Sequence, residues 1–146
     1  MISEEKAMHI LGVARKCFQV ARERGMSERD CQRAFIAGWL HDIGYEFGHA
    51  GNKNFIGADM VSLLMGATAM RMKYAVENQG IPGVEMNPLL EVLNLADLQV
   101  NERGDDVGFE TRLEDIKEHF GENSPQYQNA LEMMNQLIYK GVERHE

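Results

Sequence analysis

His41 and Asp42 are adjacent in the sequence and combine an imidazole nitrogen with a carboxylate oxygen, two ligand types that transition metals use. Helical periodicity places Asp42 on the apolar face of the segment 31–42, so its carboxylate is expected to point inward. Adjacent residues of a regular helix diverge by about 100°. Both side chains can therefore reach one ion only where the helix ends, and Gly44 supplies that end.

Two further residues, on other predicted helices, are also candidate metal ligands. Asp97 follows Leu90 and Leu93 on one predicted helix face, and an unpaired inward carboxylate is unfavourable. A buried ion pair or a helix cap would be the ordinary explanation for an inward Asp97. A role as a metal ligand is the more specific explanation. His9 lies one turn before Val13, at the edge of an apolar stripe, where a satisfied core histidine competes with a ligand.

Taken together, these residues predict a site for one divalent metal ion. The expected ligands are two imidazoles and two carboxylates from three predicted helices: His9, His41, Asp42 and Asp97. This nitrogen and oxygen set suits Mn, Fe, Co, Ni or Zn, whereas Mg prefers oxygen alone and fits less well. Such an ion can convert bound water to hydroxide near neutral pH and can neutralise charge on a phosphoryl group.

Helical periodicity dominates the chain, and runs that alternate at period two are nearly absent. We therefore expect an all-α fold, a single compact helical bundle of about six to seven helices, forming one domain over residues 1–146. Ser27, Pro88 and Ser124 mark helix starts. The predicted helices span about 3–24, 27–42, 55–64, 67–78, 88–100, 109–119 and 125–142, with polar loops at 45–54 and 101–106.

Composition narrows the classes of partner. A formal net charge of −8 repels nucleic-acid backbones and anionic membranes, so neither is expected as a partner. An anionic substrate then needs a locally positive site. No signal peptide or bilayer-length apolar run is evident, and Cys17 and Cys31 fall on apolar helical positions as free thiols. A cytoplasmic protein is the expectation.

With these residues in place, the chain resembles the HD superfamily of metal-dependent phosphohydrolases. The segment Ala-Gly-Trp-Leu-His-Asp-Ile-Gly at 37–44 is very close to the central motif of that family, and Asn-Leu-Ala-Asp-Leu at 94–98 is similar to its last segment. The resemblance implies hydrolysis of a small phosphate ester, of which a nucleotide is one class, by metal-activated water. It also implies that Asp42 orients or deprotonates that water.

The chain departs from the family pattern in ways that bear on activity. Family members with two metals carry extra histidines, at positions that correspond here to Lys53 and the segment 77–79. Only His49 lies in this interval, so a second metal is not expected. The missing histidines motivate an alternative function, a catalytically weak or inactive module that binds metal or nucleotide for regulation.

Four further residues are candidates beside the expected metal. Lys53 and His49 could bind the phosphate, and solvated loop residues are the competing interpretation. Glu46 is a candidate catalytic residue, since it keeps half of an acidic pair found in the branch that hydrolyses guanosine tetraphosphate, but that activity is not assigned. Arg112 could reach the site, although an exposed ion pair with a neighbouring glutamate is favoured. A homodimer is the default oligomer.

Overall fold

The computed structural model describes residues 3–42 and 70–139. Over these ranges the backbone forms helices and one isolated bridge, between Val100 and Asp106, which confirms the all-α class. None of the helices in these ranges is long and apolar enough to cross a bilayer. The α-helices are α1 (Glu4–Glu23), α2 (Glu28–Leu40), α5 (Met70–Asn78), α6 (Pro88–Asp97), α7 (Phe109–Phe120) and α8 (Pro125–Met134).

Serine caps fix where the first two helices begin. The hydroxyls of Ser3 and Ser27 accept hydrogen bonds from the backbone N–H groups of Lys6 and Asp30, each at 3.1 Å. Asp30, three residues after Ser27, does not complete a capping box, because its carboxylate accepts a hydrogen bond from Arg33 at 3.0 Å. The side-chain cap of α2 is therefore the serine hydroxyl, with Glu28 and Asp30 as acidic residues of the first turn.

Two helix ends differ from the sequence prediction. Helix α6 starts at Pro88 as predicted but ends at Asp97 and not near Val100, because the chain turns there into a loop closed by the hydrogen bond from Asn101 N to Asp105 O at 2.9 Å. Helix α8 starts after Ser124 as predicted, but its α-helical hydrogen bonding stops at Met134 and a π-helix follows over Asn135–Tyr139. The predicted helix at 55–64 and residues 140–142 lie outside the described ranges.

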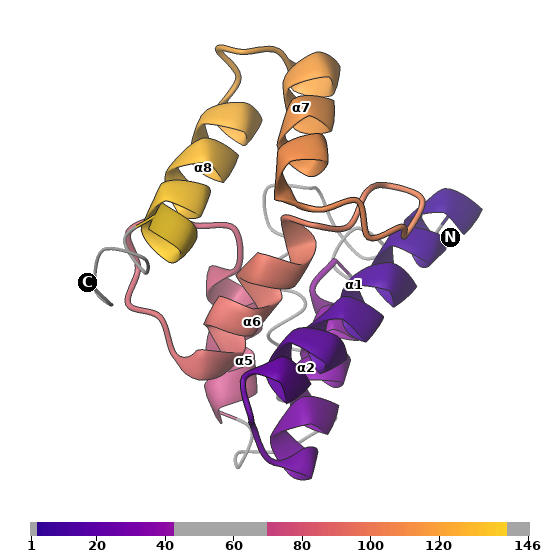
Figure 1. Cartoon of the computed structure of the whole chain (residues 1–146), viewed down its shortest axis with the longest axis vertical. Helices are drawn as coiled ribbons and strands as arrows, with labels where there is room; N and C mark the ends of the chain where they lie inside the picture. Colours follow the sequence, from indigo (N-terminus) through magenta and orange to yellow (C-terminus); the bar gives the residue numbers. More distant parts are fainter. Residues whose placement is uncertain (1–2, 43–69, 140–146) are drawn as a thin grey trace.

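The main core lies where α1, α2, α5 and α6 meet (Figure 1). The predicted apolar stripe of α1 is buried, including Val13 and Cys17, and Cys31 of α2 is buried against it. Both cysteines are free thiols, as expected. Burial, together with the negative charge of Asp97, raises the pKa of the Cys17 thiol, so this thiol stays protonated and packs as a small apolar group.

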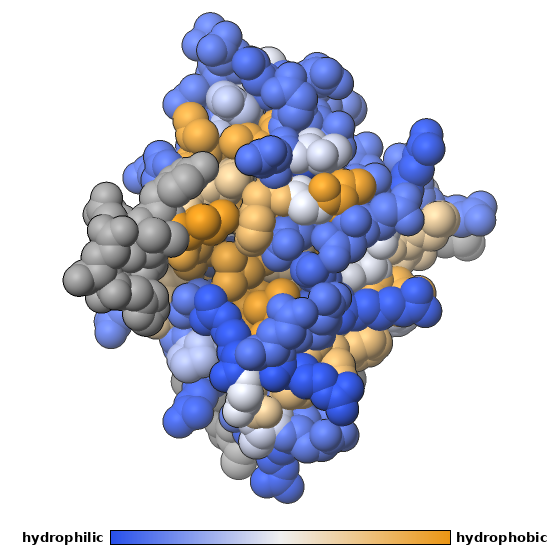
Figure 2. Space-filling view, in the orientation of Figure 1, coloured by the Kyte–Doolittle hydropathy of each residue, from blue (hydrophilic) through white to orange (hydrophobic). Residues whose placement is uncertain are grey.

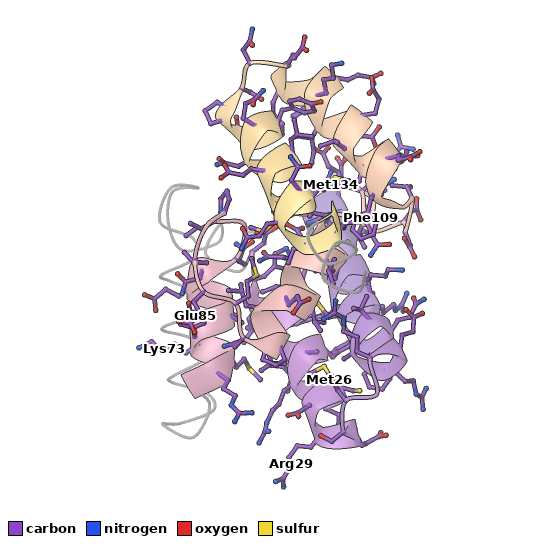
Figure 3. All side chains as sticks on the ribbon, turned by 60° about the vertical axis from the view of Figure 1, so that its left-hand side comes forward. Met26, Arg29, Lys73, Glu85, Phe109 and Met134 are labelled. Atoms are coloured by element: carbon purple, nitrogen blue, oxygen red, sulfur yellow. The ribbon has the colours of Figure 1, made fainter. Side chains whose placement is uncertain are left out.

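Helices α7 and α8 form a hairpin over a second, smaller core. Its buried residues are Leu98 from the end of α6 and Ala130, Met133 and Met134 from α8. Phe109 at the start of α7 packs against them and lies next to Met134 (Figure 3). On the face of the molecule drawn in Figure 2, hydrophobic side chains are visible across the middle. They lie between the hydrophilic tip of the hairpin and the hydrophilic lower end of the molecule. Helix α7 itself has no fully buried residue.

Candidate metal centre

The end of α2 brings His41 and Asp42 to the same place. Helix α2 stops at Leu40, His41 is its C-cap, and Asp42 follows in a turn. The His41 side chain is 0% exposed and that of Asp42 is 6% exposed, with His41 Nε2 lying 3.3 Å from Asp42 Oδ2. The convergence expected of adjacent residues at a helix end is therefore present.

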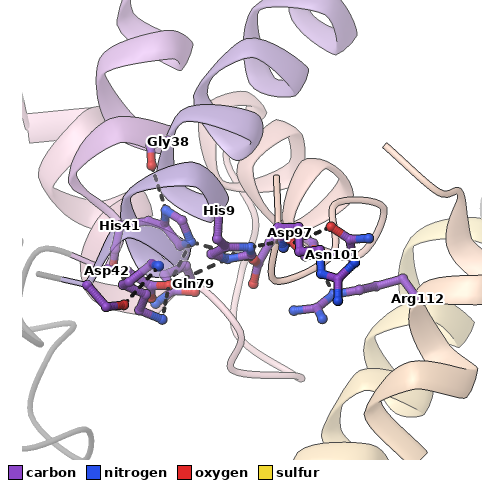
Figure 4. A network of polar contacts seen from close by, with 11 residues as sticks. His9, Gly38, His41, Asp42, Gln79, Asp97, Asn101 and Arg112 are labelled. Atoms are coloured by element: carbon purple, nitrogen blue, oxygen red, sulfur yellow. Dashed lines mark hydrogen bonds and ion pairs between the residues drawn. The ribbon is translucent and has the colours of Figure 1, made fainter. Parts of the chain in front are cut away.

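His9 of α1 and Asp97 of α6 complete a ring of four side chains (Figure 4). His9 Nε2 lies 3.6 Å from Asp42 Oδ2 and 3.3 Å from Asp97 Oδ1. His41 Nε2 lies 3.5 Å from the same Asp97 oxygen. His9 is buried, but the Asp97 side chain is 31% exposed, so it borders a cleft and is not enclosed in the core as its helix face had suggested.

Backbone carbonyls determine which nitrogen each histidine presents to this ring. His9 Nδ1 lies 2.8 Å from the carbonyl oxygen of Asn101, and His41 Nδ1 lies 2.5 Å from that of Gly38. A carbonyl oxygen can only accept, so each Nδ1 carries the hydrogen and donates it. Each Nε2 is thereby left to bind a proton or a cation, the second-shell arrangement found around metal-ligating histidines.

The donor set fits a divalent metal ion. Within the described residues, His41 Nε2 is a buried nitrogen with no hydrogen-bond partner. The ligand atoms of His9, His41 and Asp42 all lie within 4.8 Å of one another. Two ligands held about 2.1 Å from one ion lie about 3.0 to 3.4 Å apart at octahedral or tetrahedral angles, close to the separations in the ring. Small side-chain movements would therefore close the ring around a cation.

A model of the HD domain family matches residues 7–102. The chain belongs to the HD domain family. The match covers more than half of the chain, includes all four residues of the ring, and ends before α7. Neither a curated protein nor a solved structure matches the chain significantly. The HD domain family consists generally of metal-dependent phosphohydrolases, which agrees with a histidine and aspartate cluster able to hold a metal.

The two carboxylates of the ring raise the affinity of His41 in this HD domain for a proton. Burial lowers the pKa of His41, but the Asp42 and Asp97 carboxylates outweigh burial and raise that pKa to about 9. Burial raises the pKa of Asp97, but the close contacts and positive charge of His41 and His9 hold that pKa well below its usual range. The two carboxylates thus attract positive charge to His41 Nε2.

Without metal, the HD domain is expected to lose about 3 kcal/mol of unfolding free energy as the pH rises from about 6.5 to about 9. The pKa of His41 is raised from 6.5 to about 9 by folding, so its contribution is fully present below 6.5 and lost as pH rises through 9. The lowered pKa of Asp97 does not affect stability over this interval. Its contribution to the free energy of unfolding is lost only when the pH falls into the acid range. Urea unfolding with a chelator at about pH 6 and about pH 9 measures the difference.

The control for this pH prediction is the same protein saturated with Mn²⁺ or Co²⁺. A bound ion displaces the proton from His41 Nε2, so stability should not fall over that interval. A metal-free protein that is as stable at the higher pH as at the lower one would contradict the prediction.

Lys6 is a site residue that sequence reasoning missed. Its ammonium nitrogen lies 3.0 Å from Asp42 Oδ2 and donates a hydrogen bond to it. The one available signal was helical spacing, because Lys6 precedes His9 by three residues and so shares its face of α1. The carboxylate of Asp42 therefore receives positive charge from one lysine as well as from the two imidazoles.

The loop 101–106 holds His9 from behind by packing directly on α1. A side chain at Gly12 would put its Cβ 2.3 Å from the carbonyl oxygen of Gly104, so the two backbones touch. Lys16, which is nearly buried, forms an ion pair with Asp106 at 2.6 Å. This docking places the Asn101 carbonyl within reach of His9 Nδ1. The loop thus orients one of the expected ligands.

The ring opens into a cleft of about 770 Å³, lined by His9, Asp42 and Asp97 on one side and by α7 and α8 on the other. Arg112 lines this cleft and its Nε donates to the Asp97 carbonyl at 3.4 Å. The favoured interpretation of Arg112, an exposed ion pair with a neighbouring glutamate, is therefore wrong. Gln79, in the segment where the family pattern has a histidine, is buried and donates to the carbonyl of His41 at 3.4 Å.

Three predicted site residues lie outside the described ranges. These are the candidate catalytic residue Glu46 and the candidate phosphate-binding residues His49 and Lys53. Their roles stay predictions.

Proposed function

We propose that this HD domain is a metal-dependent phosphohydrolase that acts on a small phosphate ester. The observation that supports it best is the ring of His9, His41, Asp42 and Asp97, whose imidazole Nε2 atoms are both turned toward two carboxylates at the wall of one cleft. Membership of the HD domain family supports the same chemistry. We assign all four residues as ligands of one divalent ion.

When bound, such an ion supplies a Lewis acid and lowers the pKa of a bound water. The chain's own contribution begins with Asp42, which orients or deprotonates the attacking water. Its Oδ2 is buried among His9, His41 and Lys6, so the carboxylate is held in one orientation. The carbonyls of Asn101 and Gly38 keep both imidazoles in the tautomer that leaves Nε2 as the ligand atom.

A phosphate ester would have to be held by particular cations of the cleft. The chain as a whole is acidic, with a formal net charge of −8, so an anionic ester needs local positive charge. Among the described residues that line the cleft, Lys6 and Arg112 are cationic, but Lys6 is paired with Asp42. Glutamates also line the cleft, so Arg112 and a bound ion are the groups that would hold an anionic ester. A volume of about 770 Å³ suits a small molecule, and a nucleotide is one ester of that size.

The protein purified without chelators is expected to contain about one equivalent of a divalent transition metal. Supplied with Mn²⁺ or Co²⁺, it should release inorganic phosphate from members of a panel of sugar phosphates and nucleotides. The double variant His41→Ala, Asp42→Ala should lose the metal and at least about a hundredfold of the hydrolysis rate, since it removes two ligands at once. Elemental analysis and a phosphate-release assay measure the two effects.

Asp30→Asn is the matched control, because Asp30 lies on the same helix as the site and pairs only with Arg33 among the described residues. It should keep metal and activity. Full hydrolysis by the double variant would overturn the proposal. Tight binding of phosphate esters without turnover of any of them would instead favour the regulatory alternative, which thermal shift with the same panel would reveal.

A further inference from the structure

Helix α7 places a cation beside the ring and then continues away from it. Arg112 Nε donates to the carbonyl of Asp97, a residue of the ring, and the arginine side chain lines the cleft (Figure 4). Guanidinium carries five N–H donors in a planar fork that matches phosphate oxygens. With Nε engaged by the backbone, the terminal nitrogens are the ones left to meet an anion in the cleft.

The residues that follow Arg112 along the cleft are apolar. Ile116 and Phe120 also line it, and they come four and eight residues after Arg112, so the three lie along one side of α7. Eight residues of α-helix span about 12 Å. The α7 side of the cleft therefore changes from the cationic Arg112 to the aromatic Phe120 about 12 Å farther along the helix axis.

Helix α8 adds amide groups to the same part of the cleft. Gln126 and Asn129 line it, with Met133 one turn closer to the second core. Since α7 and α8 form a hairpin (Figure 1), the start of α8 lies near the end of α7 that carries Phe120. An amide side chain both donates and accepts hydrogen bonds, so this end can bind the polar edge of a ring that packs on the aromatic face.

Two residues of the cleft expose apolar surface that the two cores do not bury. Phe120 is 46% exposed and Ile81 is 42% exposed, and both line the cleft. They are two of the four large hydrophobic side chains exposed in the described part of the chain. Exposed apolar groups inside a concave, partly polar cleft are typical of a ligand site.

We propose that the α7–α8 hairpin selects the substrate by its leaving group. Arg112 binds the phosphoryl group, and Phe120 stacks on a flat aromatic group at the other end of the substrate. This rests on the proposed hydrolase function and adds the substrate class to it. The proposed substrate class is a phosphate monoester in which a spacer about the size of a sugar joins the phosphate to an aromatic group. The polar edge of that aromatic group would contact Asn129. The family match ends at residue 102, so the hairpin lies outside the matched residues.

The test compares two phosphate esters, adenosine 5′-monophosphate, which carries an aromatic base, and ribose 5-phosphate, which lacks one. The wild-type protein is expected to hydrolyse the ring-bearing ester with a kcat/KM at least about tenfold higher, as the stacking of one base on an aromatic side chain suggests. Phe120→Ala should abolish this preference by lowering only the value for adenosine 5′-monophosphate. Arg112→Met should lower both values alike, because both esters carry the same phosphate.

Tyr127→Ala is the matched control, since Tyr127 is an aromatic residue of the same hairpin that does not line the cleft. It should keep the preference, and a loss equal to that of Phe120→Ala would overturn the proposal by showing that a loosened hairpin suffices. Equal wild-type hydrolysis of both esters would also overturn it and leave the hydrolase function standing. If the wild type hydrolyses neither ester, the panel assay above still decides the hydrolase function, and calorimetric binding decides the role of the hairpin. A binding preference for adenosine 5′-monophosphate that Phe120→Ala removes supports that role, and no preference overturns it.

Discussion

Asp97→Asn is expected to weaken metal binding by more than about a hundredfold and to lower phosphate release in proportion. The substitution keeps the size of the side chain but replaces the oxygen that lies 3.3 and 3.5 Å from the two imidazole nitrogens by part of a neutral amide. Loss of a group that only supports a ligand costs 10- to 100-fold in affinity, so loss of a ligand should exceed about that range. Isothermal calorimetry with Mn²⁺ measures the affinity directly.

The same variant separates a metal ligand from a structural ion pair. If Asp97 is a ligand, Mn²⁺ stabilises the wild type and fails to stabilise the variant, a difference of about 2.7 kcal/mol where the ion is 100-fold above the wild-type dissociation constant. If Asp97 only neutralises His9 and His41, the metal-free variant loses stability but binds Mn²⁺ as the wild type does, which would contradict our assignment. Glu91→Gln is the control, because Glu91 is a carboxylate of the same helix paired with Arg24 outside the cleft.

Gly104→Ala is expected to lower the free energy of unfolding by about 3 kcal/mol or more and to weaken metal binding at least about tenfold. Gly104 has a φ of +85°, and a Cβ there would lie 2.1 Å from the carbonyl oxygen of Met8 in α1. Backbone faces backbone, so the loop 101–106 must move away from α1. The carbonyl of Asn101 would then leave His9 Nδ1. Urea unfolding and calorimetry measure the two losses.

Gly83→Ala separates the steric effect from backbone strain. Gly83 has a φ of +84°, but a Cβ there meets nothing within 4 Å. We expect this control to lose only about 1 kcal/mol, the cost of a left-handed conformation, and to bind metal normally. Gly12→Ala is a second test, since alanine alone would favour the helix by about 1 kcal/mol, whereas a clash with the Gly104 carbonyl predicts a loss. Equal effects of Gly104→Ala and Gly83→Ala would refute the docking of the loop.

Local signals in the sequence were sufficient to predict most described helices and the residues of the ring. Ser27, Pro88 and Ser124 begin helices because caps and first-turn prolines act within three or four residues. The face that carries Asp42 could be predicted because helical periodicity is regular up to the end of α2. The π-helix after Met134 has no comparable signal, since it differs from an α-helix only in its hydrogen-bond register.

The supporting residues could not be predicted because their partners are distant in sequence. Lys6 contacts a carboxylate 36 residues away, and the carbonyl that orients His9 lies 92 residues away. A backbone carbonyl also leaves no trace in residue type, so Asn101 could not be recognised. Arg112 was assigned to a neighbouring glutamate because helical spacing alone favours local pairs. Its actual partner depends on how α7 leaves the loop after α6.

The docking of the loop 101–106 on α1 also bears on the order in which the protein folds. The ring needs a helix from the start of the chain and a loop and helix from well beyond its middle, and contacts of that sequence separation form late because chain closure is entropically unfavourable. A nascent chain that has not yet made α6 therefore lacks a complete site. Metal binding should be one of the last events of folding. The bound ion should then link the first part of the chain to α6 and stabilise their contact.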